Sequence, residues 1–318
     1  MATPFDKHFR LLLTISLAAV VAYTGFALWS GAEEATAAAR RVGLGGGALL
    51  LSLSLFNYTV RFGRWQLYLS RLGHRVPLGL SLRYYLASFA FTLTPGKLGE
   101  GVRSFYLKPH GVPFASSFSA LFVERLFDLC ATLLFAALGV FYFGRYLPLV
   151  AFFVIAVLLI LLLLNNAGFR GRLRTVRVER MMGVLDALDD AAVLTRGRLL
   201  VVGLLLSLLG WGAEAAAFHI TLRLIGLELP LIASLGTYGL AVSIGALSFF
   251  PGGLGSTEAT MIVLLGLGGV GVADAGAATI ILRLTTLWFA VILGVLFALS
   301  LRHKGATPVK TEAVANVE

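Results

Sequence analysis

Two short stretches interrupt apolar sequence with the same residue types. The first is PGKLGEG at 95–101 and the second is PGGLGSTE at 251–258, and each brings a carboxylate, Glu100 or Glu258, next to proline and several glycines. Proline ends or breaks a helix, and the free N–H groups at a helix N-terminus favour an anion. We expect both prolines to end helices and both stretches to expose a helix N-terminus to a charged or polar group.

Ionisable side chains also occur inside the apolar segments, where burial of a charge is costly and a functional role is the default hypothesis. A guanidinium suits a phosphate because its planar fork donates two parallel hydrogen bonds. The predicted substrate-binding residues are Arg61, Arg64, Lys97, Glu100, Arg103, Glu124, Arg125, Asp128, Glu214, Glu258 and Arg283. The predicted hairpin breaks are Pro95, Gly96, Gly99, Pro251, Gly252 and Gly255.

Several of these residues have a purely structural alternative. Arg125 and Asp128 are three residues apart on one helix, a spacing that predicts an ion pair. For Arg125 and Arg283 the alternative to phosphate capture is ion pairing with Glu124 or Glu214. We expect Arg223, near the end of a span, to extend to the membrane interface, and His219 to be a packing residue with its hydrogen bond satisfied.

The composition is that of a polytopic membrane protein. Of 318 residues, 58% are hydrophobic and 13% are charged, whereas a soluble domain is about half apolar and a quarter charged. The net charge of +10 does not indicate a nucleic-acid partner, because the basic residues lie between apolar segments. A single cysteine excludes a cysteine-cluster metal site, and no residue pattern predicts a nucleophile, a metal or another cofactor. We therefore do not expect an enzyme.

Apolar runs long enough to cross about 30 Å of hydrocarbon predict an all-α fold. Six full spans are predicted at Phe9–Ser30, Val42–Val60, Phe114–Phe143, Leu147–Leu164, Leu199–Leu224 and Ala275–Leu301. Two shorter runs, about 80–107 and about 231–269, are predicted to be re-entrant hairpins, because a broken backbone at membrane depth must lie within protein or line a cavity. The basic and aromatic segment Arg61–Arg75 is predicted to be an interfacial helix.

This order divides the chain into a first membrane half at 1–165, an amphipathic cytoplasmic linker at 166–198, a second membrane half at 199–303 and a polar tail at 304–318. The basic loops favour cytoplasmic N- and C-termini. Three spans then separate the hairpins, so the first enters from the cytoplasm and the second from outside. Arg125 follows Pro95 by 30 residues and Arg283 follows Pro251 by 32, which predicts an inverted repeat of the transporter type.

At these residues the chain resembles a flippase-like integral membrane family related to the membrane domain of lysylphosphatidylglycerol synthases. The resemblance rests on Arg61, Arg64 and Trp65, on PGKLGEGVR and ERLFDL in the first half, and on PGGLGSTE with Arg283 in the second. It implies movement of a lipid with a polar head between leaflets, in a bacterial inner membrane. Aminoacyl phospholipids, polyprenyl-linked sugars, glycolipids and hopanoids all stay open as substrates, and a lipid-synthesising enzyme is a candidate partner.

Three functions are carried forward from the sequence. The first is a lipid flippase or scramblase that moves a phosphate-containing head through a groove between the hairpins. The second is an ion- or proton-coupled secondary transporter of a small anion. The third is a membrane-embedded lipid-modifying enzyme, which the lack of a nucleophile or metal pattern disfavours. A groove open to lipid supports the first function, and a closed central cavity supports the second.

Overall fold

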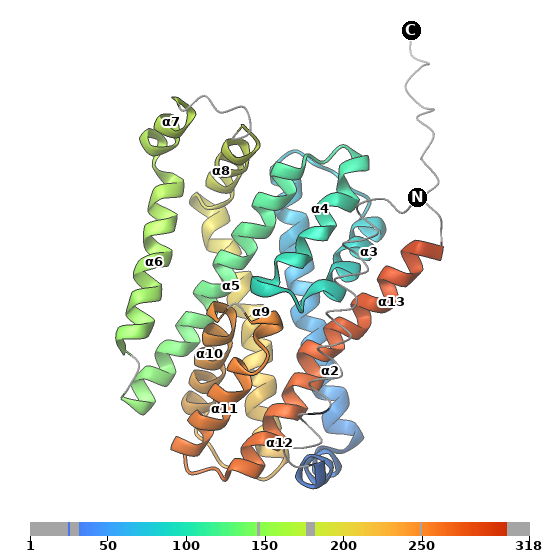
Figure 1. Cartoon of the computed structure of the whole chain (residues 1–318), viewed down its shortest axis with the longest axis vertical. Helices are drawn as coiled ribbons and strands as arrows, with labels where there is room; N and C mark the ends of the chain where they lie inside the picture. The colour runs from blue at the N-terminus through green and yellow to red at the C-terminus, as the bar shows by residue number, and fades with distance from the viewer. Residues whose placement is uncertain (1–24, 26–31, 145–146, 176–181, 249, 304–318) are drawn as a thin grey trace.

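The computed structural model describes residues 25, 32–144, 147–175, 182–248 and 250–303. These residues form a helical bundle in which the longest helices run side by side (Figure 1), and no strand occurs among them. The helices of the first half are α2 (Ala32–Arg71), α3 (Leu78–Ser88), η1 (Phe89–Phe91), η2 (Pro95–Gly101), α4 (Val102–Leu107), η3 (Lys108–His110), α5 (Phe114–Phe143) and α6 (Leu147–Asn165). Then follow α7 (Ala167–Thr175), α8 (Met182–Leu194), α9 (Gly197–Leu224), α10 (Leu231–Leu247), η5 (Pro251–Gly253), α11 (Ser256–Leu267), α12 (Val272–Arg283), η6 (Leu284–Trp288) and α13 (Phe289–His303).

Four of the described helices are long and apolar enough to cross a membrane: Glu33–Arg71, Phe114–Phe143, Gly197–Leu224 and Val272–Leu301. A fifth crossing is available if α6 and α7, which meet at a 73° bend, count as one broken span. The predicted span Phe9–Ser30 and the tail at 304–318 lie outside the described residues. The all-α membrane fold is therefore confirmed, with four to five spans where the structure describes the chain.

The predicted interfacial helix Arg61–Arg75 is wrong. Helix α2 continues through this segment to Arg71, and its side chains Arg64 and Trp65 are buried inside the bundle. The basic and aromatic pattern arises because this end of α2 faces other helices rather than lipid head groups. Near its start, α2 is interrupted at Gly43, whose φ of 61° and ψ of 179° turn the chain between two helical segments.

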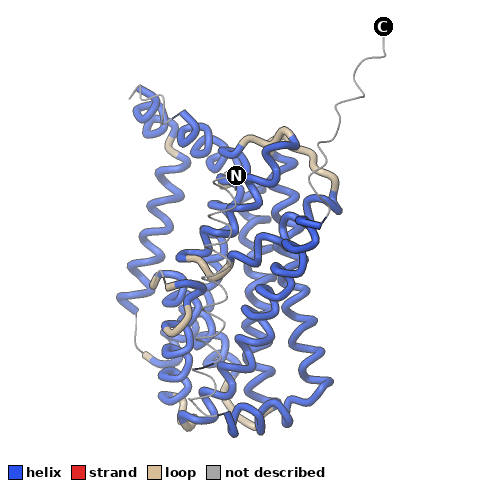
Figure 2. The backbone as a smooth tube through the Cα atoms, turned by 45° about the vertical axis from the view of Figure 1, so that its right-hand side comes forward, coloured by secondary structure: helices blue, strands red, loops and turns tan. Residues whose placement is uncertain are grey.

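The two predicted hairpins enter the bundle from opposite ends, α3 with α4 from one and α10 with α11 from the other (Figure 1). Their tips, η2 and η5, pack against each other in the middle of the bundle, where the loops meet in Figure 2. The sequence predicted that the two prolines end the preceding helices, and this prediction is wrong. Helix α3 stops at Ser88 and α10 at Leu247, and Pro95 and Pro251 each begin a 3-10 turn, where a missing N–H is tolerated.

The second hairpin is held against the first half by close backbone packing. Helix α10 runs along α5, and Gly236 on α10 lies against the backbone of Gly139 on α5, with no room for a side chain between them. The predicted linker 166–198 contains α7 and α8; α8 packs beside α5, and its Leu185 is buried. Val178 and Met181, two of the apolar positions of the predicted amphipathic helix, lie outside the described residues.

Candidate functional site

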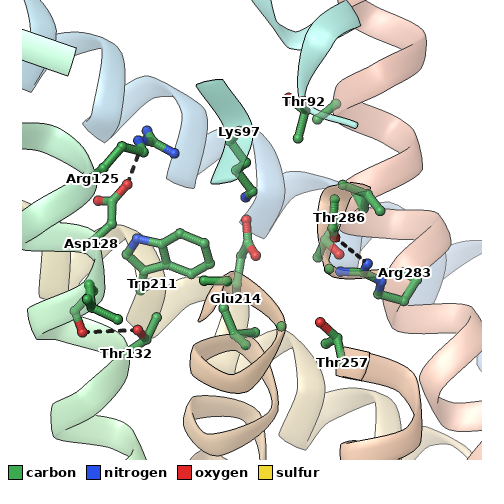
Figure 3. A pocket seen from close by; sticks show the side chains of 18 of the residues that line it. Thr92, Lys97, Arg125, Asp128, Thr132, Trp211, Glu214, Thr257, Arg283 and Thr286 are labelled. Atoms are coloured by element: carbon green, nitrogen blue, oxygen red, sulfur yellow. Dashed lines mark hydrogen bonds and ion pairs between the residues drawn. The ribbon is translucent and has the colours of Figure 1, made fainter. Parts of the chain in front are cut away.

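A cavity of about 230 Å³ lies where the two hairpin tips meet. Its walls come from α2, both hairpins, α5, α9 and the segment that joins α12 to α13. Seven of the predicted charged residues line it: Arg61, Lys97, Glu100, Arg125, Asp128, Glu214 and Arg283 (Figure 3). The folded chain thus gathers residues that lie up to 222 positions apart, Arg61 to Arg283, around one space.

The first half contributes two arginines and two carboxylates to this cavity. Arg125 Nη2 lies 3.1 Å from Asp128 Oδ2, which confirms the predicted pair, and 3.6 Å from Glu100 Oε2. Arg61 Nη2 lies 3.6 Å from the same Glu100 oxygen. Although these distances allow ion pairing, the Nε and Nη2 atoms of both arginines are buried without a hydrogen-bond acceptor among the described residues. These arginines therefore have donors left for an oxyanion.

Behind this cluster lies a second layer of charges that does not reach the cavity. Arg64 donates a 2.8 Å hydrogen bond to Asp128 Oδ1 and also contacts Ser207. Arg103 pairs with Glu124 and stacks its guanidinium 3.6 Å from the centre of the Trp65 ring. Arg64, Arg103 and Glu124, which the sequence predicted to bind substrate, are not among the residues that line the cavity.

In the second half, Arg283 and Glu258 form a direct ion pair, the closed pair. Arg283 Nε donates to Glu258 Oε1 at 2.6 Å, and its Nη2 donates to the carbonyl oxygen of Gly252 at 2.9 Å. The other oxygen of Glu258 accepts the Gly255 N–H at 2.7 Å and so caps the first turn of α11. The expected partners were wrong on both sides, because Arg283 pairs with Glu258 rather than Glu214, and Glu124 pairs with Arg103 rather than Arg125.

The predicted anion site at the start of α11 is therefore already filled by a carboxylate of the chain itself.

The five-residue π-helix η6 begins directly after Arg283, and such insertions in an α-helix are frequent at functional sites. Both glutamate–arginine pairs, Glu100 with Arg125 and Glu258 with Arg283, are separated by 25 residues in the sequence.

The third charged region of the cavity centres on Glu214. Its Oε2 accepts a 2.7 Å hydrogen bond from Tyr238, and no basic residue of the described chain lies within 4.0 Å of it. Lys97 extends from the first hairpin tip toward this carboxylate (Figure 3), with its Nζ 5.3 Å from the centre of the Trp211 ring. Trp211 was not predicted from the sequence, although it precedes Glu214 by three residues, a spacing that puts Trp211 and Glu214 on one face of α9.

Threonines and one aromatic residue complete the site, and sequence reasoning missed them as well. The polar lining includes Thr92, Thr132, Thr257 and Thr286 (Figure 3); a lone hydroxyl residue in an apolar helix gives little signal in a sequence. At the rim lies Phe250 of the second hairpin, which is 58% exposed. The cavity lining therefore includes an exposed aromatic side chain next to the second hairpin tip.

Among the predicted substrate-binding residues, six basic side chains and five carboxylates lie in the interior, so the fully ionised cluster has one excess positive charge.

His219 hydrogen-bonds Ser234 at 2.9 Å, and the Arg223 side chain is 57% exposed at the end of α9, as expected for both. No group of three or more His, Cys, Asp or Glu side chains in the described part of the chain is arranged to hold a metal ion.

The sequence of this chain can be compared with models of known protein families. The family model of the lysylphosphatidylglycerol synthase TM region matches residues 13–294. The chain belongs to this family. Curated relatives are named only as UPF0104 membrane proteins, all from Methanothermobacter thermautotrophicus. One is 31% identical over 103 residues, which is 32% of this chain and 30% of the relative, and a second is 33% identical over 94 residues, 30% and 28%.

A third UPF0104 relative of the same organism is 20% identical over 257 residues, which covers 69% of this chain and 73% of the relative. For the two relatives with higher identity, the chain matches less than a third of their length. Membership of the lysylphosphatidylglycerol synthase TM region family confirms the resemblance stated from the sequence and is compatible with a lipid-related function in a membrane.

Proposed function

We propose that this protein moves a lipid with a phosphate-containing head between the two leaflets of a membrane. The single observation that carries the proposal is the cavity at the hairpin tips, whose lining combines arginine donors with an exposed aromatic side chain. Arg61 and Arg125 supply buried N–H groups without hydrogen-bond acceptors, and the lining residue Phe250 is 58% exposed. A lipid head can occupy the polar space while its acyl chains stay outside in hydrocarbon.

The charge balance supports an anionic head. One excess positive charge in a low-dielectric interior is unfavourable by itself, and a phosphodiester with one negative charge neutralises it. The closed pair of Arg283 and Glu258 contributes nothing to this excess, so the anion binds next to Arg61 and Arg125. This assignment changes the expectation from the sequence, in which Arg125 and Arg283 hold the phosphate in turn.

An inverted repeat is part of the proposal. The hairpins enter from opposite ends of the bundle, and each places a glutamate 25 residues before an arginine of a following helix. Such repeats allow a transporter to expose one central site to each side in turn. With the basic loops on the cytoplasmic side, the α7–α8 end of the bundle lies in the cytoplasm and the first hairpin enters from there; the bacterial inner membrane is the proposed location.

The test is a flipping assay in vesicles of phosphatidylcholine and phosphatidylglycerol that contain the purified protein. A fluorescent phosphatidylglycerol in the inner leaflet becomes accessible to an impermeant quencher when it crosses. We expect the wild-type protein to accelerate crossing and Arg125→Gln to abolish it, because the neutral amide cannot replace a guanidinium. Arg223→Gln removes an exposed arginine outside the cavity and should leave crossing unchanged.

The same vesicles distinguish the alternative substrate. If the probe lipid crosses no faster than in empty vesicles, the flippase proposal is overturned for phospholipids. Uptake of radiolabelled inorganic phosphate in that case would identify a transporter of a small soluble anion. A probe lipid that crosses equally fast with Arg125→Gln would instead refute the role of the arginine site.

A further inference from the structure

Lys97 is held in an unusual backbone conformation at the tip of the first hairpin. Its φ of 57° is the one positive φ of a non-glycine residue in the described ranges. This left-handed region disfavours residues that have a Cβ, so glycine is normally found there. A lysine that persists at such a position needs a compensating interaction, and its side chain extends into the cavity rather than into solvent or lipid (Figure 3).

The Lys97 ammonium lies in a place suited to a cation. Its Nζ is 5.3 Å from the centre of the Trp211 ring, within the range of a cation–π interaction. The Lys97 side chain extends toward Glu214 (Figure 3), a buried carboxylate that accepts a hydrogen bond from the neutral Tyr238 hydroxyl. An aromatic face beside a carboxylate is the chemistry with which proteins bind alkylammonium groups, and here the chain fills that subsite with its own ammonium.

The cation subsite and the anion subsite share one cavity and are adjacent. Arg61 and Arg125 lie beside Glu100, and the Arg61 guanidinium carbon is also 5.9 Å from the centre of the Trp211 ring. The Lys97 side chain extends toward Glu214 (Figure 3). A zwitterionic head, with a phosphate and an ammonium on a short linker, would place its phosphate near the arginines and its ammonium near Glu214. That second position is occupied, so the ammonium would meet a like charge in a buried space, which is strongly unfavourable.

We propose that Lys97 determines the lipid class by occupying the headgroup-ammonium subsite formed by Trp211 and Glu214, so that the cavity takes anionic phosphodiester heads without an amine and rejects zwitterionic ones. The inference rests on the proposed lipid transport and deepens it. Selection arises in two ways, because the lysine blocks the ammonium and also provides the excess positive charge that an anionic head neutralises.

The experiment compares two fluorescent probes, phosphatidylglycerol and phosphatidylethanolamine, in the vesicle assay described above. The wild-type protein should move the phosphatidylglycerol probe and discriminate against the phosphatidylethanolamine probe. Lys97→Met keeps the length of the side chain and removes its charge, so phosphatidylethanolamine should speed up and phosphatidylglycerol slow down. We expect their ratio to change by about tenfold or more, since hydrogen bonds to charged groups differ from neutral ones by about that factor.

Two further variants protect the test against trivial failure. Lys97→Gly relieves the left-handed conformation and should fold at least as well as wild type, while it empties the same subsite and gives the same shift. Lys97→Met combined with Glu214→Gln removes the carboxylate that receives the new ammonium and should lose the gain in phosphatidylethanolamine movement. Lys108→Met, which removes an exposed lysine of the same hairpin, is the matched control and should keep wild-type selectivity.

The outcomes distinguish a failure of the inference about selectivity from a failure of the proposed lipid transport. An unchanged ratio in both Lys97→Met and Lys97→Gly overturns the inference about selectivity, even if the wild-type protein moves phosphatidylglycerol. Equal movement of both probes by the wild-type protein overturns it as well. If the wild-type protein moves neither probe, the proposed lipid transport itself fails, and the inference fails with it.

Discussion

Replacing Arg283 with glutamine should destabilise the fold, although this arginine lines the cavity. The substitution leaves the buried Glu258 carboxylate with the hydrogen bond from the Gly255 N–H but without its charged partner, and it removes the 2.9 Å bond to the Gly252 carbonyl oxygen. Breaking one side of a buried ion pair costs about 3–5 kcal/mol. We expect a loss of that size in the free energy of unfolding.

The second substitution, Glu258→Gln in the Arg283→Gln background, removes the isolated charge. Most of the lost stability should return, and about 1–2 kcal/mol of destabilisation should remain for the hydrogen bonds that a neutral pair makes less well. Adding Glu258→Gln should then recover about 2–3 kcal/mol of the free energy of unfolding lost in Arg283→Gln. Titration with a denaturing detergent, followed by tryptophan fluorescence, measures each free energy of unfolding.

Arg125→Gln is the matched comparison on the other half. Each carboxylate near Arg125 has a second basic partner, since Asp128 keeps the 2.8 Å bond from Arg64 and Glu100 keeps Arg61 at 3.6 Å. We expect a destabilisation of about 1 kcal/mol or less, together with the loss of lipid movement. Equal destabilisation by Arg125→Gln and Arg283→Gln, or no recovery in the double mutant, would refute this division between a binding arginine and a structural one.

Two more predictions test the topology and the packing. In a Cys130→Ala background, Asp186→Cys on α8 should resist an impermeant thiol reagent added outside cells, and Val272→Cys at the opposite end should react; the reverse pattern would refute a cytoplasmic α7–α8 end. Gly236→Ala should destabilise the bundle strongly, because its methyl group meets the α5 backbone, whereas Gly276→Ala has open space and should be neutral or stabilising by about 0.4–1 kcal/mol. Thermal unfolding of both variants decides this contrast.

The helices that the sequence predicted best are those with a local signal at each end. Helix α5 was predicted at its observed bounds, Phe114–Phe143, because an apolar run lies between Pro113 and Gly144. Proline begins a helix easily, and Gly144 adopts the left-handed conformation that ends one. The two hairpins were found for a related reason, since their proline and glycine residues interrupt runs too short to cross.

The error at Arg61–Arg75 has a different cause. An interfacial helix and a helix that faces a polar protein interior have the same pattern, apolar on one side and basic or aromatic on the other. What distinguishes them is the presence of carboxylates on neighbouring helices, such as Asp128 and Glu124 of α5 beside Arg64. That information depends on how distant segments pack, so the local pattern of α2 could not provide it.

The choice of ion-pair partners shows which part of the site was nonetheless present in the sequence. The sequence offered Asp128 and Glu124 as partners of Arg125. Each hairpin glutamate, however, precedes its arginine by 25 residues, a regularity that pairs Glu100 with Arg125 and Glu258 with Arg283. The two pairs still differ, because Arg125 has Asp128 three residues later and Arg283 has Thr286 there. Asp128 draws Arg125 to 3.1 Å and leaves Glu100 at 3.6 Å, whereas Arg283 closes on Glu258 at 2.6 Å.

The difference between Asp128 and Thr286 at these positions accompanies a difference between the two glutamate–arginine pairs. In the half with the extra carboxylate, the arginine is shared between two acceptors and satisfies neither fully, so its remaining donors stay available in the cavity. In the half with the threonine, one glutamate and one carbonyl oxygen engage the arginine and hold the hairpin tip to α12. In the proposed inverted repeat, Asp128 thus lies on the side of the proposed anion site, and Thr286 lies on the side where Arg283 is held by Glu258.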